Sequence, residues 1–276
     1  MEPDVPIPNV SVVVPVFDEE GAAPALAREI AAAFAGRAFE LIFVNDASRD
    51  GTAAALAALQ GEIPQLRLLA HAKNAGQSRA VRSGIMAARA PIVVTLDGDG
   101  QNDPADAPRL VDHLAAGPPT LALVGGVRVK RQDSMAKKLA SRFANGVRQR
   151  LLNDSAADTG CGLKAMRREA FLRLPYFDHV HRYLPALMIR EGYQVAFEPV
   201  GHRQRQTGRS KYTNLGRLWV SFSDLSGVMW LNARARHPGE VSELGERAEH
   251  HRDNEQVEGA GEEGHASSGG TRLARR

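Results

Sequence analysis

The chain has 276 residues, of which 43% are hydrophobic and 24% are charged, a globular composition that excludes collagen-like, coiled-coil and wholly disordered proteins. Its net charge of +3 is unevenly distributed, because residues 237–276 hold nine acidic and five basic side chains and leave 30 basic and 23 acidic ones to the rest. This basic body indicates an anionic partner, which could be a nucleic acid, a membrane surface or a phosphate-bearing substrate.

The first half of the chain alternates short apolar runs with helical patterns rich in Ala, Leu and Arg. We predict strands at Val10–Val16, Leu41–Asn45, Leu66–His71 and Ile92–Leu96, and helices at Ala22–Ala35, Thr52–Leu59 and Gln77–Ala90. Nearly continuous apolarity is typical of strands buried on both faces of a parallel sheet, so the alternation predicts a doubly wound α/β fold. Ligands of such sheets bind beyond the carboxyl ends of the strands.

The second half is more mixed. We predict helices at Pro104–Ala116, Ser134–Leu152 (strongly basic), Tyr183–Glu191 and Leu215–Ala235, and strands at Leu121–Val127, Gln194–Pro199 and Gly201–Gln206. The last helix is amphipathic, with two Trp and flanking Arg, which suits either a membrane–water interface or packing on the protein's own core. We therefore predict a main domain over 1–213, an interfacial helix over 214–236, and a disordered tail over 237–276.

Several site classes are excluded by composition. The single Cys161 rules out an intramolecular disulfide framework and a multi-cysteine metal site, and we expect it to be a small buried thiol. His179 and His181 lack metal-ligand spacing and are expected to be structural. No run of about 18 apolar residues predicts a membrane span, and Met1–Asn9 lacks the apolar core of a signal peptide, so we expect a cytoplasmic protein.

The sharpest motif is TLDGDGQNDP at positions 95–104. Asp97 and Asp99 follow a buried strand, where unpaired charge is costly unless a cation meets it. Carboxylate oxygens in a loop suit Mg²⁺ or Mn²⁺, which in turn bind a substrate diphosphate. The alternative is a turn capped by aspartates, and this motif alone does not decide between the two.

Other strand ends carry polar residues too. Asp46 follows the second strand and could accept hydrogen bonds from a nucleobase edge. Glu19 follows the first strand at a helix start, where the helix dipole favours an acid in any case. The turn Lys73–Ser78 contains a glycine before the third helix and could face an anion.

Taken in order, these segments resemble the family-2 glycosyltransferases of the GT-A fold. The motifs are VVVPVFDEE, FVNDASRDGT, KNAGQSRAVRSGI and TLDGDGQNDP, and the downstream VGGVRVKRQD, DTGCGLKAMRRE and GRSKYT resemble the dolichol-phosphate mannose synthase branch. The resemblance covers about Asn9 to Arg236. It implies a GT-A fold, which is a Rossmann-like and mostly parallel central sheet flanked by helices.

The resemblance also implies roles for individual residues. The nucleotide-sugar would be bound by Pro15, Phe17, Glu19, Asp46 and Asp97, and the divalent metal by Asp97, Asp99 and Gln101. The acceptor phosphate would be held by Arg128, Arg131, Arg142, Arg209 and Lys211. Catalytic roles fall on Asp97, Asp99, Arg128, Arg142, Lys211 and, beside the reaction centre, Asp158. The chain departs from the family pattern at Asn45, at Asp18 and over Gly160–Lys164.

By this resemblance we expect metal-dependent, inverting transfer of one sugar from a UDP- or GDP-linked donor to a polyprenyl phosphate. The expected partners are the donor, the lipid acceptor, the membrane surface and a membrane-embedded protein, with no nucleic acid. We place the enzyme at the cytoplasmic face of the membrane, in the synthesis of cell-envelope glycan or lipid. The sugar stays open, and the alternatives are transfer to a glycan or soluble hydroxyl and a non-enzymatic nucleotide or nucleic-acid binder.

Overall fold

A computed structural model describes residues 7–129, 146, 148–152, 154, 158–203 and 214–236, with the side chains of 214–221 outside that description. The chain divides into two compact units, Met1–Ala235 and Arg236–Arg276. The first unit carries every helix and strand of the described residues. Most of the predicted basic helix Ser134–Leu152 and the whole predicted tail lie outside the described residues.

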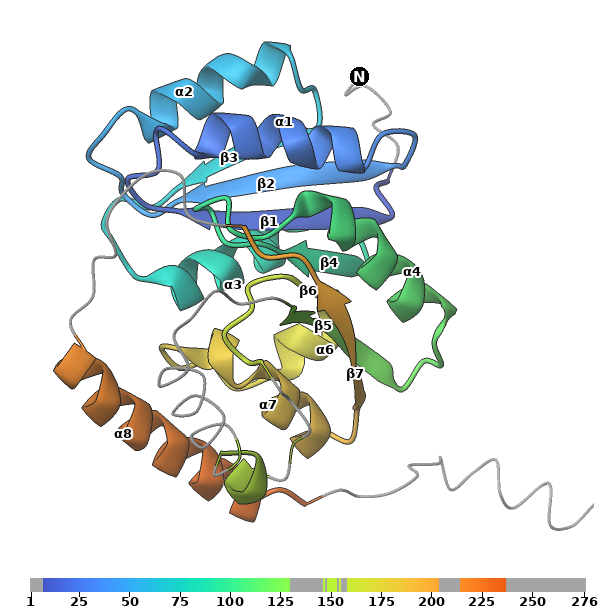
Figure 1. Ribbon diagram of the computed structural model, residues 1–276, viewed down its shortest axis with the longest axis vertical. Helices are drawn as coiled ribbons and strands as arrows, with labels where there is room; N and C mark the ends of the chain where they lie inside the picture. Colours follow the sequence, from blue (N-terminus) through green and yellow to red (C-terminus); the bar gives the residue numbers. More distant parts are fainter. Residues whose placement is uncertain are drawn as a thin grey trace, which may run out of the picture. The chain divides into compact units, whose positions relative to one another are not determined.

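A seven-stranded sheet with the order β3-β2-β1-β4-β6-β5-β7 forms the centre of the fold (Figure 1). Its strands are β1 Val10–Val16, β2 Phe39–Asn45, β3 Leu66–Ala70, β4 Ile92–Thr95, β5 Leu121–Arg128, β6 Lys164–Arg167 and β7 Gln194–Val200. The pairs among β1 to β4 and the β5–β7 pair are parallel. The short β6 runs antiparallel to both of its neighbours, β4 and β5. The predicted mostly parallel sheet flanked by helices is thus confirmed.

Helices cover both faces of the sheet (Figure 1). They are α1 Ala23–Ala33, α2 Thr52–Ala58, α3 Gln77–Ala87, α4 Ala107–Ala116, α6 Arg168–Arg173, α7 Leu184–Arg190 and α8 Asn214–Ala233, with short 3₁₀ turns η1 Leu59–Gly61, η2 Pro104–Asp106 and η3 Val180–Arg182. One apolar cluster joins α1, α2 and α4 to one face of the sheet, and a second joins α3, α6 and α7 to the other.

Strand β1 shows why the sequence is apolar at nearly every position. Val12 and Val14 belong to one apolar cluster and Val13 to the other, and all three side chains are fully buried. The exception is Ser11, whose hydroxyl donates a 2.6 Å hydrogen bond to the buried carboxylate of Glu40. A strand with both faces covered has no face in contact with water, so a polar side chain there needs a hydrogen-bond partner within the protein.

The sequence missed some elements of the second half. It did not predict β6 or α6, which lie in the region read as mixed. The strand predicted at Gly201–Gln206 is absent over its described part, where His202 makes only an isolated bridge to Asn102. Helix α3 ends at Ala87, three residues before the predicted end, and Ala88 is already extended.

Helix α8 combines the two predicted environments. Val228 is fully buried, and Leu225 and Leu231 pack against the same apolar cluster as α3, α6 and α7. On its exposed side, Phe222 and Trp230 have 66% and 58% of their surface accessible. Among the helices that the structure describes, none is both long enough and apolar enough to span a bilayer.

Candidate active site

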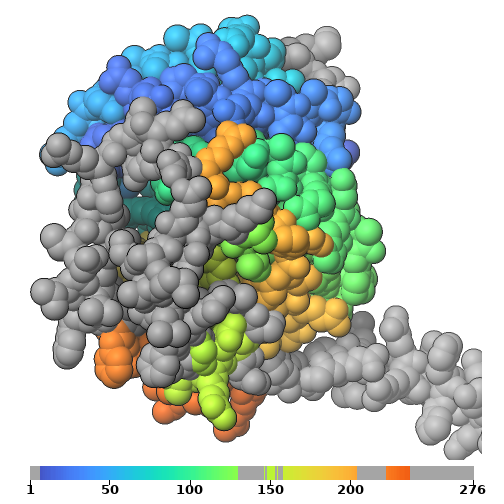
Figure 2. Space-filling view, in the orientation of Figure 1, coloured from blue at the N-terminus to red at the C-terminus, as the bar shows by residue number. Residues whose placement is uncertain are grey.

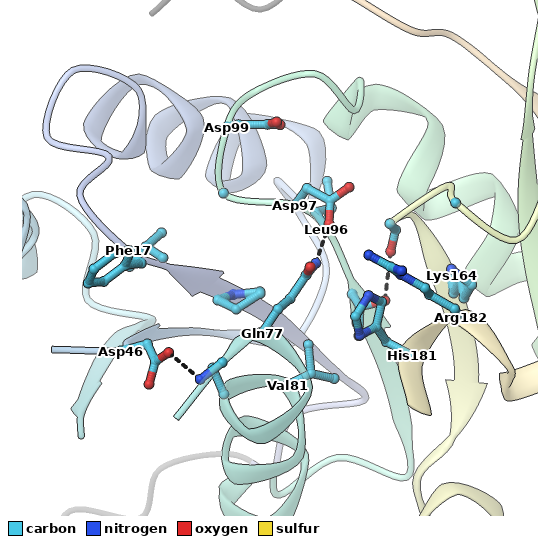
Figure 3. A pocket seen from close by; sticks show the side chains of 18 of the residues that line it. Phe17, Asp46, Gln77, Val81, Leu96, Asp97, Asp99, Lys164, His181 and Arg182 are labelled. Carbon is cyan, nitrogen blue, oxygen red and sulfur yellow. Dashed lines mark hydrogen bonds between the residues drawn. The ribbon is translucent and has the colours of Figure 1, made fainter. Parts of the chain in front are cut away.

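A cavity of about 760 Å³ lies at the carboxyl ends of β1, β2 and β4, where the topology predicts a ligand site. Its lining includes Pro15 near the end of β1, Phe17 and Glu19 after β1, Asp46 after β2, and the 96–101 loop after β4. A second stretch, 159–164 and 181–184, completes the wall. Figure 3 shows Phe17 and Asp46 at one end, Asp97 between, and Lys164, His181 and Arg182 at the other end.

The loops that follow β1 and β2 are bound to each other. The backbone N–H of Glu19 donates to the Thr52 hydroxyl at 2.9 Å, and the N–H of Arg49 donates to the Asp18 carboxylate at 2.7 Å. Asp18 adopts a left-handed conformation with φ of 51°, which these contacts hold in place. The wall that carries the side chains of Phe17 and Glu19 is therefore fixed from two directions.

Asp46 is the most fully bonded carboxylate of the cavity. It is 3% exposed and accepts hydrogen bonds from the N–H groups of Ala75 at 2.9 Å and Gly76 at 2.8 Å. Nδ1 of His71 lies 2.7 Å from the same carboxylate, and Nε2 of His71 lies 2.9 Å from the Ser83 hydroxyl. The turn before α3 therefore binds the carboxylate of Asp46, whereas the sequence suggested that this turn could face an external anion.

Asp97 and Asp99 stand on the loop after β4, and both line the cavity. Gln77, the first residue of α3, donates a 2.8 Å hydrogen bond to the Asp97 carboxylate, and the N–H of Asp97 donates to the buried Asn102 at 3.0 Å. Asp99 accepts a 3.1 Å bond from the N–H of Gln101. Burial, and next the charge of Asp99, raise the pKa of Asp97, so the two carboxylates repel each other in this pocket.

Gly162 makes room for Asp97. A Cβ atom at Gly162 would lie 2.3 Å from Cγ and Oδ2 and 2.4 Å from Oδ1 of Asp97, far inside van der Waals contact. The Gly162 carbonyl accepts a 2.8 Å hydrogen bond from the Thr95 hydroxyl, which fixes this close approach. The GCGLK segment therefore needs a glycine at this position for a steric reason.

The donor set of the cavity fits a hard divalent cation that also binds the substrate. Two carboxylates and the amide of Gln101 line the same region. Over the described part of the chain, no cluster of three or more His, Cys, Asp or Glu side chains is arranged to hold a metal. Mg²⁺ and Mn²⁺ are commonly bound by one or two carboxylates, with phosphate oxygens and water completing the coordination sphere.

The far end of the cavity is basic. Lys164 is 4% exposed and its ammonium donates to the Cys161 carbonyl, while Arg182 extends toward the cavity from η3 (Figure 3). Nδ1 of His181 lies 2.7 Å from the Ser78 hydroxyl. Burial, followed by the charges of Lys164 and Arg182, lowers the pKa of His181 to about 3, so its ring is neutral near pH 7.

These three residues were not assigned to the site from the sequence, and His181 had been expected to be structural. Cys161, by contrast, is the buried free thiol that was predicted, although it also lies in the cavity wall. In the sequence, Lys164, His181 and Arg182 stand in segments to which no role had been assigned, so only their basic side chains could have drawn attention to them.

Arg128 and Asp158 are bound to each other. The guanidinium donates two hydrogen bonds to the carboxylate, Nε to Oδ2 at 2.7 Å and Nη2 to Oδ1 at 2.8 Å. Burial alone would lower the pKa of Arg128, but the hydrogen bond and charge of Asp158 raise it. Neither side chain is among those that line the cavity. Four further residues predicted to bind the acceptor lie outside the described residues: Arg131, Arg142, Arg209 and Lys211.

The end of β7 supports the loop that carries Gln101. The N–H of Arg203 donates to the Gln101 carbonyl at 2.9 Å. The guanidinium of Arg203 binds Asp103 at 2.9 Å and Glu29 of α1 at 2.5 Å. Figure 2 shows this orange segment against the blue surface of the first helices. The segment thus braces the carboxylate loop from outside.

The Glycosyl transferase family 2 model matches residues 11–174. The chain belongs to this family. The sequence-based prediction of a family-2 glycosyltransferase is therefore confirmed, and the non-enzymatic alternative is set aside. The match covers the strands from β1 to β6, the cavity loops after β1, β2 and β4, and the segment of Asp158 to Lys164.

Two named relatives are similar to this chain in sequence. The chain is 37% identical over 213 residues to the undecaprenyl-phosphate 4-deoxy-4-formamido-L-arabinose transferase of Pectobacterium carotovorum, which covers 76% of this chain and 64% of that relative. The enzyme of the same name from Pseudomonas aeruginosa is 36% identical over 220 residues, covering 79% of this chain and 64% of the relative. The chain thus spans a little under two thirds of the length of these relatives.

Solved structures share the fold of this glycosyltransferase. A mannosyltransferase from Pyrobaculum calidifontis in complex with GDP-Man and Mn²⁺ has a TM-score of 0.60 at 20% identity, covering 84% of this chain and 66% of the other. Glucosyl-3-phosphoglycerate synthase from Mycobacterium tuberculosis, in complex with Mn²⁺, UDP and its product, has a TM-score of 0.61 at 19% identity, covering 84% and 82%. Both neighbours are thus Mn²⁺ complexes.

Proposed function

We propose that this glycosyltransferase moves one sugar from a UDP- or GDP-linked donor to a polyprenyl phosphate, with inversion and with Mg²⁺ or Mn²⁺ held by Asp97, Asp99 and Gln101. The observation that carries the proposal is the shared cavity of Asp97, Asp99 and Asp46, in a chain 37% identical to an undecaprenyl-phosphate transferase. The bound cation would supply positive charge against the departing diphosphate.

The donor end is assigned to Phe17, Glu19 and Asp46. A nucleoside there would meet an aromatic side chain, the proline of β1 and a carboxylate whose position is fixed by three donors. Because those donors use Oδ1 twice and Oδ2 once, a lone pair of Asp46 is left for a base N–H. The preorganised carboxylate would select the base without having to move.

We assign a phosphate acceptor because each carboxylate of the described cavity wall already has another assignment than general base. Of the carboxylates in the described cavity wall, Asp46 is bound to the α3 turn, Asp97 and Asp99 are assigned to the metal, and Glu19 lies at the donor end. A hydroxyl acceptor would need a base beside it, whereas a phosphate monoester is already anionic near neutral pH. The cavity therefore favours a phosphate acceptor over a glycan or soluble hydroxyl.

The chain's own residues would act by orientation and charge. Gln77 would hold the Asp97 carboxylate through its 2.8 Å bond, and Asn102 would hold the backbone of the same residue. Lys164 is buried near Asp97, and burial lowers the pKa of its ammonium against the opposing charge of Asp97. Arg128 and Asp158 would stiffen the strand end through their bidentate pair rather than touch the substrate.

Attachment to the cytoplasmic face of the membrane is assigned to α8. Its exposed Phe222, Met229 and Trp230 lie on one helix with Arg234, whose guanidinium stands 5.2 Å from the Trp230 ring. Exposed aromatic residues with adjoining cations are typical of helices that lie in the interface plane.

The transfer test uses the purified full chain with undecaprenyl phosphate in detergent, a panel of UDP- and GDP-sugars, and Mn²⁺ or Mg²⁺. Mass spectrometry should detect a lipid-linked monosaccharide with one donor, and removal of the metal with EDTA or the change Asp99→Ala should abolish it. Transfer to free polyprenol or to a soluble glycan, with none to the phosphate, would reverse the assignment of the acceptor.

The membrane test measures flotation with vesicles of anionic or neutral lipid. Trp230→Ser should reduce vesicle binding several-fold and leave the fold intact, because the side chain is 58% exposed. The matched control is Met86→Ser on α3, which removes a comparably exposed apolar side chain. Equal losses from both variants would reject α8 as the attachment surface.

A further inference from the structure

Arg182 is the cavity's unassigned cation. It belongs to η3 and lines the cavity from the end that lies opposite Phe17 and Asp46 (Figure 3). Its neighbours Val180 and Tyr183 are 3% and 5% exposed and pack in the core, so the short turn that presents Arg182 is anchored on both sides. The position of the guanidinium is thus built into the fold.

No carboxylate pairs with Arg182 among the residues that the structure describes. Three arginines elsewhere in the described chain do have carboxylate partners: Arg128 is bound to Asp158, Arg148 to Asp154, and Arg203 to both Asp103 and Glu29. A guanidinium that is partly withdrawn from water without a counter-charge is unfavourable, and an anion that enters the cavity would relieve this cost.

The surroundings of Arg182 suit an anion. His181 is neutral, and the other basic side chain of the same wall is Lys164, whose pKa is lowered by burial. The acidic side chains of the described cavity wall, Glu19, Asp46, Asp97 and Asp99, come from the loops after β1, β2 and β4. An anionic group at the Arg182 end would therefore meet the Arg182 guanidinium, and residues 159–184 contribute no carboxylate to the described lining of the cavity.

The geometry of the proposed substitution at the anomeric carbon indicates which anionic group would lie at Arg182. In an in-line substitution the nucleophile approaches the anomeric carbon from the side opposite the leaving group. If the nucleoside lies at Phe17 and Asp46 and the diphosphate at Asp97 and Asp99, the leaving group departs toward that end. The acceptor oxygen must then enter from the Arg182 end.

We propose that Arg182 binds the acceptor phosphate inside the cavity. This inference rests on the function proposed above, and it gives the role expected of Arg128 to a residue without a carboxylate partner. Two N–H groups of the guanidinium would bind two phosphate oxygens and leave the third to attack.

The test measures equilibrium binding of farnesyl phosphate in detergent, with UDP or GDP and Mn²⁺ present, and separately the binding of UDP and GDP. Arg182→Gln should weaken farnesyl phosphate binding about 10- to 100-fold and change nucleotide binding less than about twofold. Arg182→Lys keeps the charge but not the paired donors, so its affinity for farnesyl phosphate should lie between those of the wild-type chain and Arg182→Gln. Arg89→Gln, which removes an exposed arginine away from the cavity, should leave both affinities unchanged.

Three results would overturn the proposal, and they are distinguishable. Unchanged farnesyl phosphate binding by a folded Arg182→Gln variant would remove Arg182 from the acceptor site. A matching loss of UDP or GDP binding would assign it to the donor diphosphate. Equal binding of farnesyl phosphate and farnesol by the wild-type chain would reject the proposed function itself, and Arg182 with it. If Arg182→Gln fails to fold, Arg182→Lys carries the same comparison.

Discussion

The change Gly162→Ala tests the central contact of the site. The added Cβ would lie 2.3–2.4 Å from three atoms of the Asp97 carboxyl group, so either Asp97 or the strand that carries Lys164 must move by about an ångström. Asp97 is held by Gln77, and the Gly162 backbone by Thr95. Overpacking of this kind costs about 1–3 kcal/mol, which corresponds to a Tm lowered by about 2–12 °C.

The larger effect should fall on ligand binding. Under the proposed function, a displaced Asp97 would no longer share a cation with Asp99, so we expect the Mn²⁺-dependent affinity for UDP or GDP to fall at least about tenfold, and transfer with it. The assay is a thermal shift titrated with nucleotide at fixed Mn²⁺. Gly61→Ala is the matched control, because nothing lies within 4 Å of its added Cβ. Wild-type nucleotide binding by Gly162→Ala, or an equal loss in Gly61→Ala, would refute the steric reasoning.

Three further changes test neighbouring contacts. Because burial and the charge of Asp99 raise the pKa of Asp97, its ionisation destabilises the ligand-free fold as pH rises above 3.8. Asp97→Asn should therefore raise the ligand-free Tm by an amount that grows from pH 4 to 7, and a constant difference would contradict this. Asp158→Asn should lower the stability measured by urea denaturation by about 1–3 kcal/mol, because it removes the partner of the half-buried Arg128 charge, and adding Arg128→Gln should recover part of that loss. His71→Ala should weaken nucleotide binding and leave the Mn²⁺ requirement unchanged, since the His71 ring hydrogen-bonds to Asp46, which is proposed to bind the nucleoside, and to Ser83; an altered metal requirement would contradict this.

The first half of the fold could be predicted because local and global signals agree there. Val10–Val16 matches β1 residue for residue, and the other early strands differ by at most two residues at an end. Strand β6 could not be predicted, because Lys164 and Arg167 occupy two of its four positions. Their charges are satisfied only in the tertiary structure, by the carbonyls of Cys161 and Leu121.

The residues that line the cavity could be predicted where they lie at the end of a strand. Pro15, Phe17, Asp46 and Asp97 all follow or end a parallel strand, and the topology brings such ends together. Sequence reasoning could not find Arg182, since its segment carries no motif. It also could not foresee that Asp158 would be bound to Arg128, because that pair joins positions 30 residues apart.

The sheet order divides the cavity wall between two continuous stretches of chain. The wall residues up to Gln101 come with β1, β2 and β4, and the rest, from Thr159 to Leu184, come with β6 and the turn before α7. The Thr95–Gly162 hydrogen bond spans the boundary between the two stretches. Under the proposed function, substitutions in the later stretch would change the acceptor end of the cavity and leave the side chains of the donor end in place.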